Sequence, residues 1–121
     1  MKLACLALLL FVFVSCTKTK INSPIVGTWS LDSIYVGIGN AKWESAYTFA
    51  PTNLTFYSNG SFSQNNTIFN GYNHFELISN DTIRFYDFLT RKELKVKYTL
   101  NNELAIYFNC IEGCGEKYKR N

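Results

Sequence analysis

The strongest constraint on this chain is a pattern that occurs three times along it: alternating apolar and polar residues, a short turn rich in asparagine, and a second alternating segment. The three copies cover residues 54–63, 75–86 and 96–108. Alternation with a period of two places apolar side chains on one face of a β-strand, and Asn or Gly tolerates the positive φ of a tight hairpin turn. The pattern therefore predicts three consecutive antiparallel hairpins.

The same alternation predicts which side chains of the last strands face the core. Lys95, Lys97 and Thr99 occupy one face of their strand, which should lie in water because the residues between them are apolar. Lys117 and Lys119 mark the outer face of the final strand in the same way. The side chains predicted to point inward are Val96, Tyr98, Leu100, Leu104, Ile106, Phe108, Glu116, Tyr118 and Arg120.

Composition supports strands throughout the chain. It contains ten Phe, eight Tyr and two Trp, and aromatic residues favour strands over helices. A long strand at 26–36 and a short one near 46–49 raise the expected total to about eight or nine strands. Because no crossover helix is evident, we expect an all-β fold, either an antiparallel up-and-down barrel or a strongly curved sandwich. Within residues 37–53, the segment 37–40 has the composition of a flexible loop, and Trp43 to Pro51 fit a strand, a short helical turn or a lid over the barrel mouth.

The N-terminus has the pattern of an export signal. Lys2 precedes an uncharged apolar run that extends to Val14, and polar residues begin directly after Cys16. About a dozen apolar residues are too few to cross a bilayer core of ~30 Å, but they suit the central helix of a signal peptide. We therefore expect a signal helix over residues 1–15. General signal peptidase prefers a small residue three positions before its cleavage site, and Phe13, which occupies that position, is large.

The segment Phe13-Val14-Ser15-Cys16 resembles the lipobox of bacterial lipoproteins. The resemblance implies cleavage before Cys16 and attachment of palmitate-type acyl chains to its thiol and its new amine. Several chains anchor a protein durably, since each buried methylene contributes ~0.8 kcal/mol. No aspartate follows Cys16 and no acidic cluster occupies 17–20, which favours the outer membrane, with the protein facing the periplasm. The alternative is an ordinary secretory signal that leaves Cys16 as a free or disulfide-bonded thiol.

The export signal divides the chain into three parts. Residues 1–15 form the signal, residues 16–24 the lipidated cysteine and a polar, flexible tether, and residues 25–121 the folded domain. A domain of this size can bury one core. The chain's net charge is only +3 and its lysines are scattered, whereas a nucleic-acid-binding protein would show a denser basic stripe.

The start of the domain, Ile25-Val26-Gly27-Thr28-Trp29, resembles the Gly-x-Trp signature of the lipocalin superfamily. The hairpin at 54–62 and the last strand at 116–120 are similar to those of small lipocalin-like lipoproteins of Bacteroidetes. The resemblance implies a lipocalin-like barrel in which Gly27 and Trp29 close one end and Arg120 packs across the indole ring. These roles are structural. The domain is shorter than a typical lipocalin and shows no C-terminal helix.

Cys110 and Cys114 flank a three-residue loop that ends in Gly113, the composition of a hairpin turn whose third residue is left-handed. The residues that flank such a loop sit opposite each other in the ladder, at the Cα separation of a disulfide, and the periplasm is oxidising, so we expect a structural bridge. A redox-active dithiol is an alternative, but the spacing is not Cys-x-x-Cys and no helix N-terminus is evident. A metal site would need more ligands than two cysteines and a distant histidine.

No constellation typical of an enzyme stands out. His74 is the chain's one histidine, and the residues around it suggest neither a nucleophile nor an orienting acid. A pair of the acids expected in strands could perform acid–base chemistry, yet isolated carboxylates at a barrel rim are commoner. We therefore expect no catalysis, no metal and no cofactor. The acids in question are Asp32, Glu76, Asp87 and Glu116.

Two short motifs, Asp32-Ser33-Ile34 and Asp81-Thr82-Ile83, resemble the O-glycosylation sequon of exported Bacteroidetes proteins. The resemblance implies glycan on Ser33 and Thr82. Three-residue patterns also arise often by chance.

Two functions fit these expectations. In the leading hypothesis, a membrane-anchored, non-catalytic barrel binds a small apolar or amphipathic ligand, by analogy of fold. In the alternative, aromatic side chains fill the barrel, which then acts as a protein-interaction or accessory module of the cell envelope. The first predicts an enclosed apolar cavity of roughly a few hundred Å³. The second predicts an exposed aromatic patch, with Tyr35, Trp43 or Tyr47 as candidates.

Overall fold

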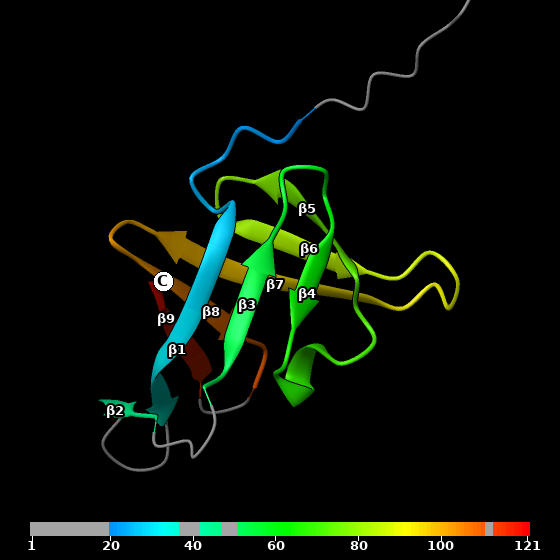
Figure 1. Ribbon diagram of the computed structural model, residues 1–121. Coiled ribbons are helices and arrows are strands. Elements are labelled where there is room, and N and C mark those ends of the chain that lie inside the picture. The colour runs from blue at the N-terminus through cyan, green and yellow to red at the C-terminus, as the bar shows by residue number, and fades with distance from the viewer. Residues whose placement is uncertain (1–19, 37–41, 47–50, 111–112) are drawn as a thin grey trace, which may run out of the picture.

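The computed structural model describes residues 20–36, 42–46, 51–110 and 113–121, which form an antiparallel sheet curled into a nearly closed barrel (Figure 1). The all-β prediction is therefore confirmed. A short 3-10 helix, η2 (Thr67–Phe69), lies between β4 and β5. No helix in this part of the chain is long and apolar enough to cross a membrane. The strands are β1 (Gly27–Val36), β2 (Lys42–Ser45), β3 (Asn53–Phe56), β4 (Phe62–Gln64), β5 (His74–Ser79), β6 (Thr82–Tyr86), β7 (Glu93–Leu100), β8 (Glu103–Phe108) and β9 (Cys114–Arg120).

The strands follow one another around the barrel as an up-and-down meander. Neighbours pair in the order β4-β3-β1-β9-β8-β7-β6-β5 within one sheet. On one edge, β1 pairs with β3 through its N-terminal half and with β2 through its C-terminal half. On its other edge β1 pairs with β9, so the first and last strands of the domain meet. This order confirms the predicted barrel and does not fit two separate sheets of a sandwich.

The barrel closes least tightly between β4 and β5. β4 is three residues long, and an isolated bridge between Ser61 and His74 joins its start to β5. Two backbone hydrogen bonds of 2.9 Å form this bridge, donated by the N–H groups of Phe62 and Phe75. Beyond the bridge, β5 has no ladder partner on that edge among the described strands as far as Ser79.

The three predicted hairpins are present, and asparagine side chains stabilise two of their turns. Asn59 accepts a hydrogen bond from the Ser61 N–H at 2.9 Å between β3 and β4. Asn101 accepts one from the Glu103 N–H at 3.1 Å between β7 and β8. In both turns the amide oxygen satisfies a backbone donor that lies outside the ladder, which is why asparagine marks these positions in the sequence.

The short strand that follows β1 lies earlier than predicted. β2 occupies Lys42–Ser45, whereas we expected a strand near 46–49. Its position follows from the hairpin with β1, in which Trp43 pairs with Tyr35 and their rings meet at 5.3 Å. Residues 47–49 lie outside the described residues, as do the predicted signal helix and the first part of the tether.

Side chains on the last three strands point as the alternation predicts. The lysines of β7 are exposed, and Lys119 of β9 is exposed as well. Among the residues predicted to face inward, Leu100 and Phe108 are half-buried and Arg120 is exposed at the barrel end. The others are buried: Val96, Tyr98, Leu104, Ile106, Glu116 and Tyr118.

Phenylalanine rings fill the middle of the barrel. Neighbouring rings have centroids 4.7–6.1 Å apart, the spacing of tilted and edge-to-face aromatic packing. The rings come from β3, β4, η2, β5 and β6, so side chains from one half of the meander occupy the space that these elements surround. The five residues, each at most 4% exposed, are Phe56, Phe62, Phe69, Phe75 and Phe85.

We expect Phe85→Ala to lower the free energy of unfolding by about 3–5 kcal/mol, because it removes a fully buried ring from close packing. Phe88→Ala is the matched control: that ring is 68% exposed, so its loss should lower the free energy of unfolding by no more than about 1 kcal/mol. Equilibrium urea denaturation measures both values. Equal losses in the two variants would contradict the assignment of the core.

Candidate functional site

The Trp29 indole, near the start of β1, is buried, with 1% of the residue exposed. Its Nε1–H donates a hydrogen bond of 2.8 Å to the Ile25 carbonyl. The guanidinium carbon of Arg120 lies 4.2 Å from the ring centre, and the same side chain donates hydrogen bonds to the carbonyls of Pro24 and Val26. Since Trp29 is the ladder partner of Arg120, this contact joins the two ends of the domain.

The absence of a side chain at Gly27 leaves room for the Arg120 guanidinium. The φ of Gly27 is +137°, which L side chains rarely adopt. A Cβ at this position would lie 2.7 Å from Nη1 of Arg120. The three residues expected at the barrel end, Gly27, Trp29 and Arg120, therefore lie together, and the contacts described here hold the chain in place.

A polar cluster lies inside the barrel. The Glu116 side chain is buried, at 6% exposure, and no described Lys or Arg forms an ion pair with it. Its Oε2 accepts hydrogen bonds from the Tyr118 hydroxyl and, at 2.8 Å, from Nδ2 of Asn66. Nδ2 of Asn66 also donates to the Tyr118 oxygen at 2.9 Å. Asn66 in turn caps η2 by accepting a hydrogen bond from the Ile68 N–H at 3.0 Å.

Burial changes the acidity of this cluster. It raises the pKa of the Glu116 carboxyl above its ordinary value of 4.5, although the hydrogen bonds from Tyr118 and Asn66 act in the opposite direction. Burial and the adjacent carboxylate also raise the pKa of the Tyr118 hydroxyl. A carboxyl group in a dry site is costly to ionise, so burial opposes the loss of a proton from Glu116 as well as from Tyr118.

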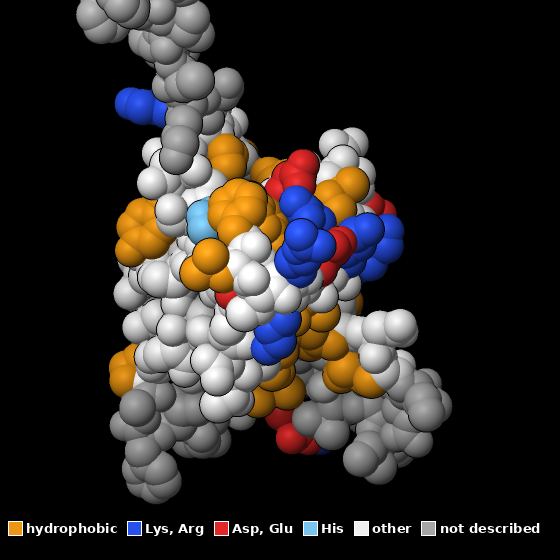
Figure 2. Space-filling model, turned by 90° about the vertical axis from the view of Figure 1, so that its right-hand side faces the viewer, with side chains coloured by type: hydrophobic (Ala, Val, Ile, Leu, Met, Phe, Trp, Pro, Cys, Tyr) orange, Lys and Arg blue, Asp and Glu red, His pale blue; other side chains and the backbone are white. Residues whose placement is uncertain are grey.

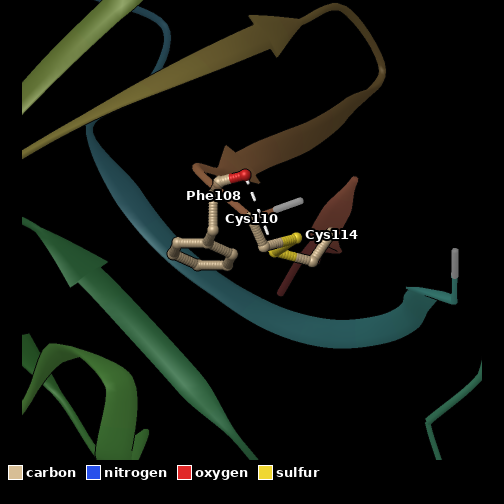
Figure 3. The surroundings of a disulfide bond; sticks show 3 residues. All are labelled: Phe108, Cys110 and Cys114. Carbon is tan, nitrogen blue, oxygen red and sulfur yellow. Dashed lines mark hydrogen bonds between the residues drawn. A yellow bond between two sulfur atoms is a disulfide. The ribbon is translucent and has the colours of Figure 1, made fainter. Parts of the chain in front are cut away.

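The predicted disulfide is present, and Figure 3 shows it at the end of β8. The Cα atoms of Cys110 and Cys114 are 6.1 Å apart. The two cysteines do not face each other in the ladder as expected, because the last ladder pair is Phe108 with Cys114. Cys110 lies beyond the strand, so the bond ties the connecting loop to β9. Closing so short a loop stabilises the fold by about 2 kcal/mol.

The dashed line in Figure 3 joins Sγ of Cys114 to the Phe108 carbonyl oxygen, 3.6 Å away. A disulfide sulfur carries no proton, so this is a sulfur–oxygen contact and not a hydrogen bond. In the bonded state neither sulfur is a thiolate, the form that acts as a nucleophile or metal ligand.

The predicted modification sites differ in accessibility. Cys16 lies outside the described residues. Ser33 is 8% exposed, between β2 and β9, so its hydroxyl has little room for a glycan. Thr82 lies at the start of β6; its hydroxyl donates to Asp81 at 2.9 Å and accepts from Lys97 at 3.1 Å. Glycosylation of either residue stays a prediction.

The acids expected in strands do not form a common site. Asp32 forms an ion pair with Lys119 at 3.3 Å, and Glu76 forms one with Arg84 at 2.9 Å. Asp87 lies just after β6, in the loop that leads to β7. Across the described ranges, no group of three or more His, Cys, Asp and Glu side chains is placed to hold a metal ion.

Asp87 organises the loop between β6 and β7. Its carboxylate accepts hydrogen bonds from the Thr90 hydroxyl at 2.9 Å and the Leu89 N–H at 3.2 Å, and these bonds lower its pKa. Its own N–H donates to the Lys92 carbonyl at 3.0 Å. Arg91 has a φ of +57°, a left-handed conformation that is uncommon for a residue with a side chain. Local hydrogen bonds thus fix the shape of this loop.

This loop, residues 87–92, presents apolar side chains to solvent; we call it the Phe88 loop. Phe88 is 68% exposed and Leu89 92% exposed. The Phe88 ring packs against His74 at 4.7 Å and Tyr86 at 5.1 Å between centroids. Figure 2 shows hydrophobic side chains around the histidine, with basic and acidic groups alongside. A cleft of about 320 Å³ adjoins them, lined by Arg84, Tyr86, Asp87, Phe88, Arg91, Lys92 and Glu93.

A second aromatic group, the Trp43 cluster, lies where β1, β2, β8 and β9 adjoin. The Trp43 ring lies edge-on to Tyr35 at 5.3 Å and to Tyr107 at 6.3 Å. The ammonium group of Lys117 lies 4.2 Å from the centre of the Trp43 ring. Two of the aromatic residues expected to form a surface patch therefore lie together, with Tyr107 39% exposed beside them. The third, Tyr47, lies outside the described residues.

Sequence reasoning missed the Phe88 loop and the role of Asn66. The loop has a signal that could have revealed it, because Phe88 and Leu89 are large apolar residues in a turn, where no alternation directs them inward. The contact between Asn66 and Glu116 has no such signal, since fifty positions separate the two residues.

Comparison of the chain with known protein families, with curated proteins and with solved structures finds no match.

We expect Glu116→Gln to become more stabilising, relative to the wild-type protein, as pH rises. Because the pKa of Glu116 is raised in the folded protein, the contribution of this carboxyl to stability is greatest below about pH 4.5, where it is protonated in both states, and is lost as pH rises through the folded-state pKa. Glutamine keeps an acceptor for Tyr118 and cannot ionise. Urea denaturation from acidic to neutral pH measures the difference in unfolding free energy, and a pH-independent difference would contradict the argument.

Proposed function

We propose that this chain is a lipid-anchored, non-catalytic lipoprotein of the cell envelope, similar to small lipocalin-like lipoproteins, whose barrel acts as a protein-interaction or accessory module. The packing of the interior carries this proposal. The five phenylalanine rings occupy the space in which a barrel of this size could otherwise hold one small ligand. This observation favours the filled barrel over the carrier of an apolar ligand.

The clefts of the described surface also fit a module better than a carrier. Those of about 280, 320 and 370 Å³ are open to solvent, whereas a carrier encloses most of its ligand. The smallest of them is lined by polar side chains only: Gln64, Asn65, Asn66, Thr67 and Asn70.

The Trp43 cluster is the surface we assign to a protein partner. Trp and Tyr dominate the binding energy of protein interfaces because they bury large areas at low entropic cost. Here Lys117 adds a charge that is fixed over the Trp43 ring. The cluster lies at the C-terminal half of β1, away from the end at which the N-terminal segment joins the barrel (Figure 1).

The cellular location in this proposal is the outer membrane, with the barrel facing the periplasm. Its support is the lipobox-like segment that ends in Cys16 and the lack of an aspartate after it. The disulfide between Cys110 and Cys114 is consistent with an oxidising compartment.

Changing Cys16→Ala tests the anchor. The wild-type protein should begin at Cys16 and carry the mass of its acyl chains, and the variant should retain its signal segment and lack that mass, because the thiol is the acylation site. Mass spectrometry of the N-terminal peptide measures both. A wild-type mature form that is unmodified, or that begins elsewhere, would disprove the lipoprotein assignment.

A fluorescent fatty-acid analogue tests the filled interior. Titration of the wild-type protein should show no saturable binding that unlabelled fatty acid displaces. Leu89→Asp is the control for adsorption of the analogue to the exposed Phe88 loop. Weak fluorescence that this variant abolishes comes from the surface and not from the interior of the barrel. Saturable binding that survives Leu89→Asp would favour the carrier.

A further inference from the structure

The N-terminal segment is attached to the barrel well before β1 begins. The Ile21 N–H donates a hydrogen bond of 2.7 Å to the Ser58 carbonyl, in the turn between β3 and β4. The Ile21 side chain packs, partly buried, against the core. It also borders an open cleft of about 370 Å³, whose other lining residues are Asn59, Gly60, Phe75, Glu76, Leu77 and Tyr86. Ile21 therefore marks where the tether ends.

This attachment limits how far the barrel can lie from the anchor. Ile21 is five positions after Cys16, and an extended chain spans at most ~3.3–3.6 Å per residue, about 17 Å in all. Part of that reach is used within the headgroup layer, which is about 5–7 Å thick on each side of the bilayer. The surface around Ile21 is thus held beside the membrane to which Cys16 would be anchored.

The Phe88 loop is continuous with this surface. Tyr86 lines both the cleft at Ile21 and the cleft at the loop. His74 stacks on the same tyrosine at 5.3 Å and contacts Phe88. The aromatic group thus extends from the attachment point of the tether to the exposed Phe88 and Leu89.

The charges beside the loop suit a lipid surface. Within the described ranges, neither Arg91 nor Lys92 forms an ion pair with a carboxylate, and both border the cleft. The loop's own acid, Asp87, is engaged by Thr90 and Leu89. Basic residues at a membrane surface attract anionic headgroups, while apolar side chains enter the layer below them.

We propose that the surface formed by Ile21, Tyr86 and the Phe88 loop docks onto the bilayer that holds the Cys16 anchor, with Phe88 and Leu89 inserted and Arg91 and Lys92 on anionic headgroups. The docking rests on the proposed lipid anchor. Because the anchor already holds the protein at the bilayer, the effective concentration of the docking surface is high. A small surface can then stay bound, although the same surface would bind a bilayer too weakly in a protein without the anchor. The rigid loop loses little entropy on insertion. Docking in this way leaves the Trp43 cluster, at the other end of β1, facing the periplasm.

A dye at the loop tests the docking. Leu89→Cys, labelled with nitrobenzoxadiazole, is compared in the full, natively processed protein with Asn102→Cys, an exposed position at the opposite end of β7. Both proteins are reconstituted into vesicles of phosphatidylcholine and phosphatidylglycerol, with spin-labelled acyl chains as quencher. The dye at position 89 should shift to the blue and be quenched, and the dye at position 102 should do neither. A water-like, unquenched signal at position 89 overturns the proposal.

Two further measurements make the result specific. Arg91→Glu combined with Lys92→Glu should reduce the quenching at position 89 in these vesicles, and unchanged quenching overturns the assigned role of the two cations. Mass spectrometry of the Cys16 peptide from the same samples separates the two proposals. Acylated Cys16 with a water-exposed position 89 refutes docking and leaves the anchor intact, whereas unacylated Cys16 refutes the anchor and the docking with it.

Discussion

The structure depends on the pairing of the first strand with the last. β1 and β9 share a ladder that runs from Trp29 and Arg120 at one end to Val36 and Cys114 at the other. Without this long-range pairing the chain would be a flat meander with two exposed edges, which is hard to keep soluble. With it, the meander becomes a barrel with an inside and an outside. The Arg120 guanidinium lies over the Trp29 ring at the end of this ladder where the domain begins. The Arg120 side chain therefore stabilises both the pairing of β1 with β9 and the segment that leads into β1.

Closure also explains how the barrel tolerates a buried acid. Glu116 faces inward because β9 alternates, and its neighbours Lys117 and Lys119 have to lie outside for the same reason. The interior must then supply hydrogen bonds in place of water. Tyr118 lies on the same face of β9, and Asn66 caps η2. A helical turn that is distant from β9 in the sequence therefore supplies a hydrogen bond to Glu116 that β9 alone does not provide.

Much of the fold follows from local sequence, and most of the site does not. The hairpins were predictable because alternation and asparagine turns act over a few residues, and the disulfide because its cysteines are four positions apart. The position of β2 was not, because the pairing of Trp43 with Tyr35 decides it, and alternation is weak there. Contacts such as Asn66 with Glu116 depend on how the barrel curves, which spacing along the chain does not encode. Phe88 was not predicted for another reason: aromatic content was interpreted as favouring strands, whereas this residue lies in the loop after β6.

The weak join between β4 and β5 has a consequence for how the barrel moves. Elsewhere each strand is held by a ladder, but here two backbone hydrogen bonds carry the closure. Local opening is cheapest where the fewest contacts break, so slow breathing of the barrel should run along this seam and leave the β1–β9 ladder intact. Backbone amides beside the seam would then exchange with solvent sooner than those of the central strands. The barrel should therefore open most easily between β4 and β5, next to Ile21, where the N-terminal segment joins it.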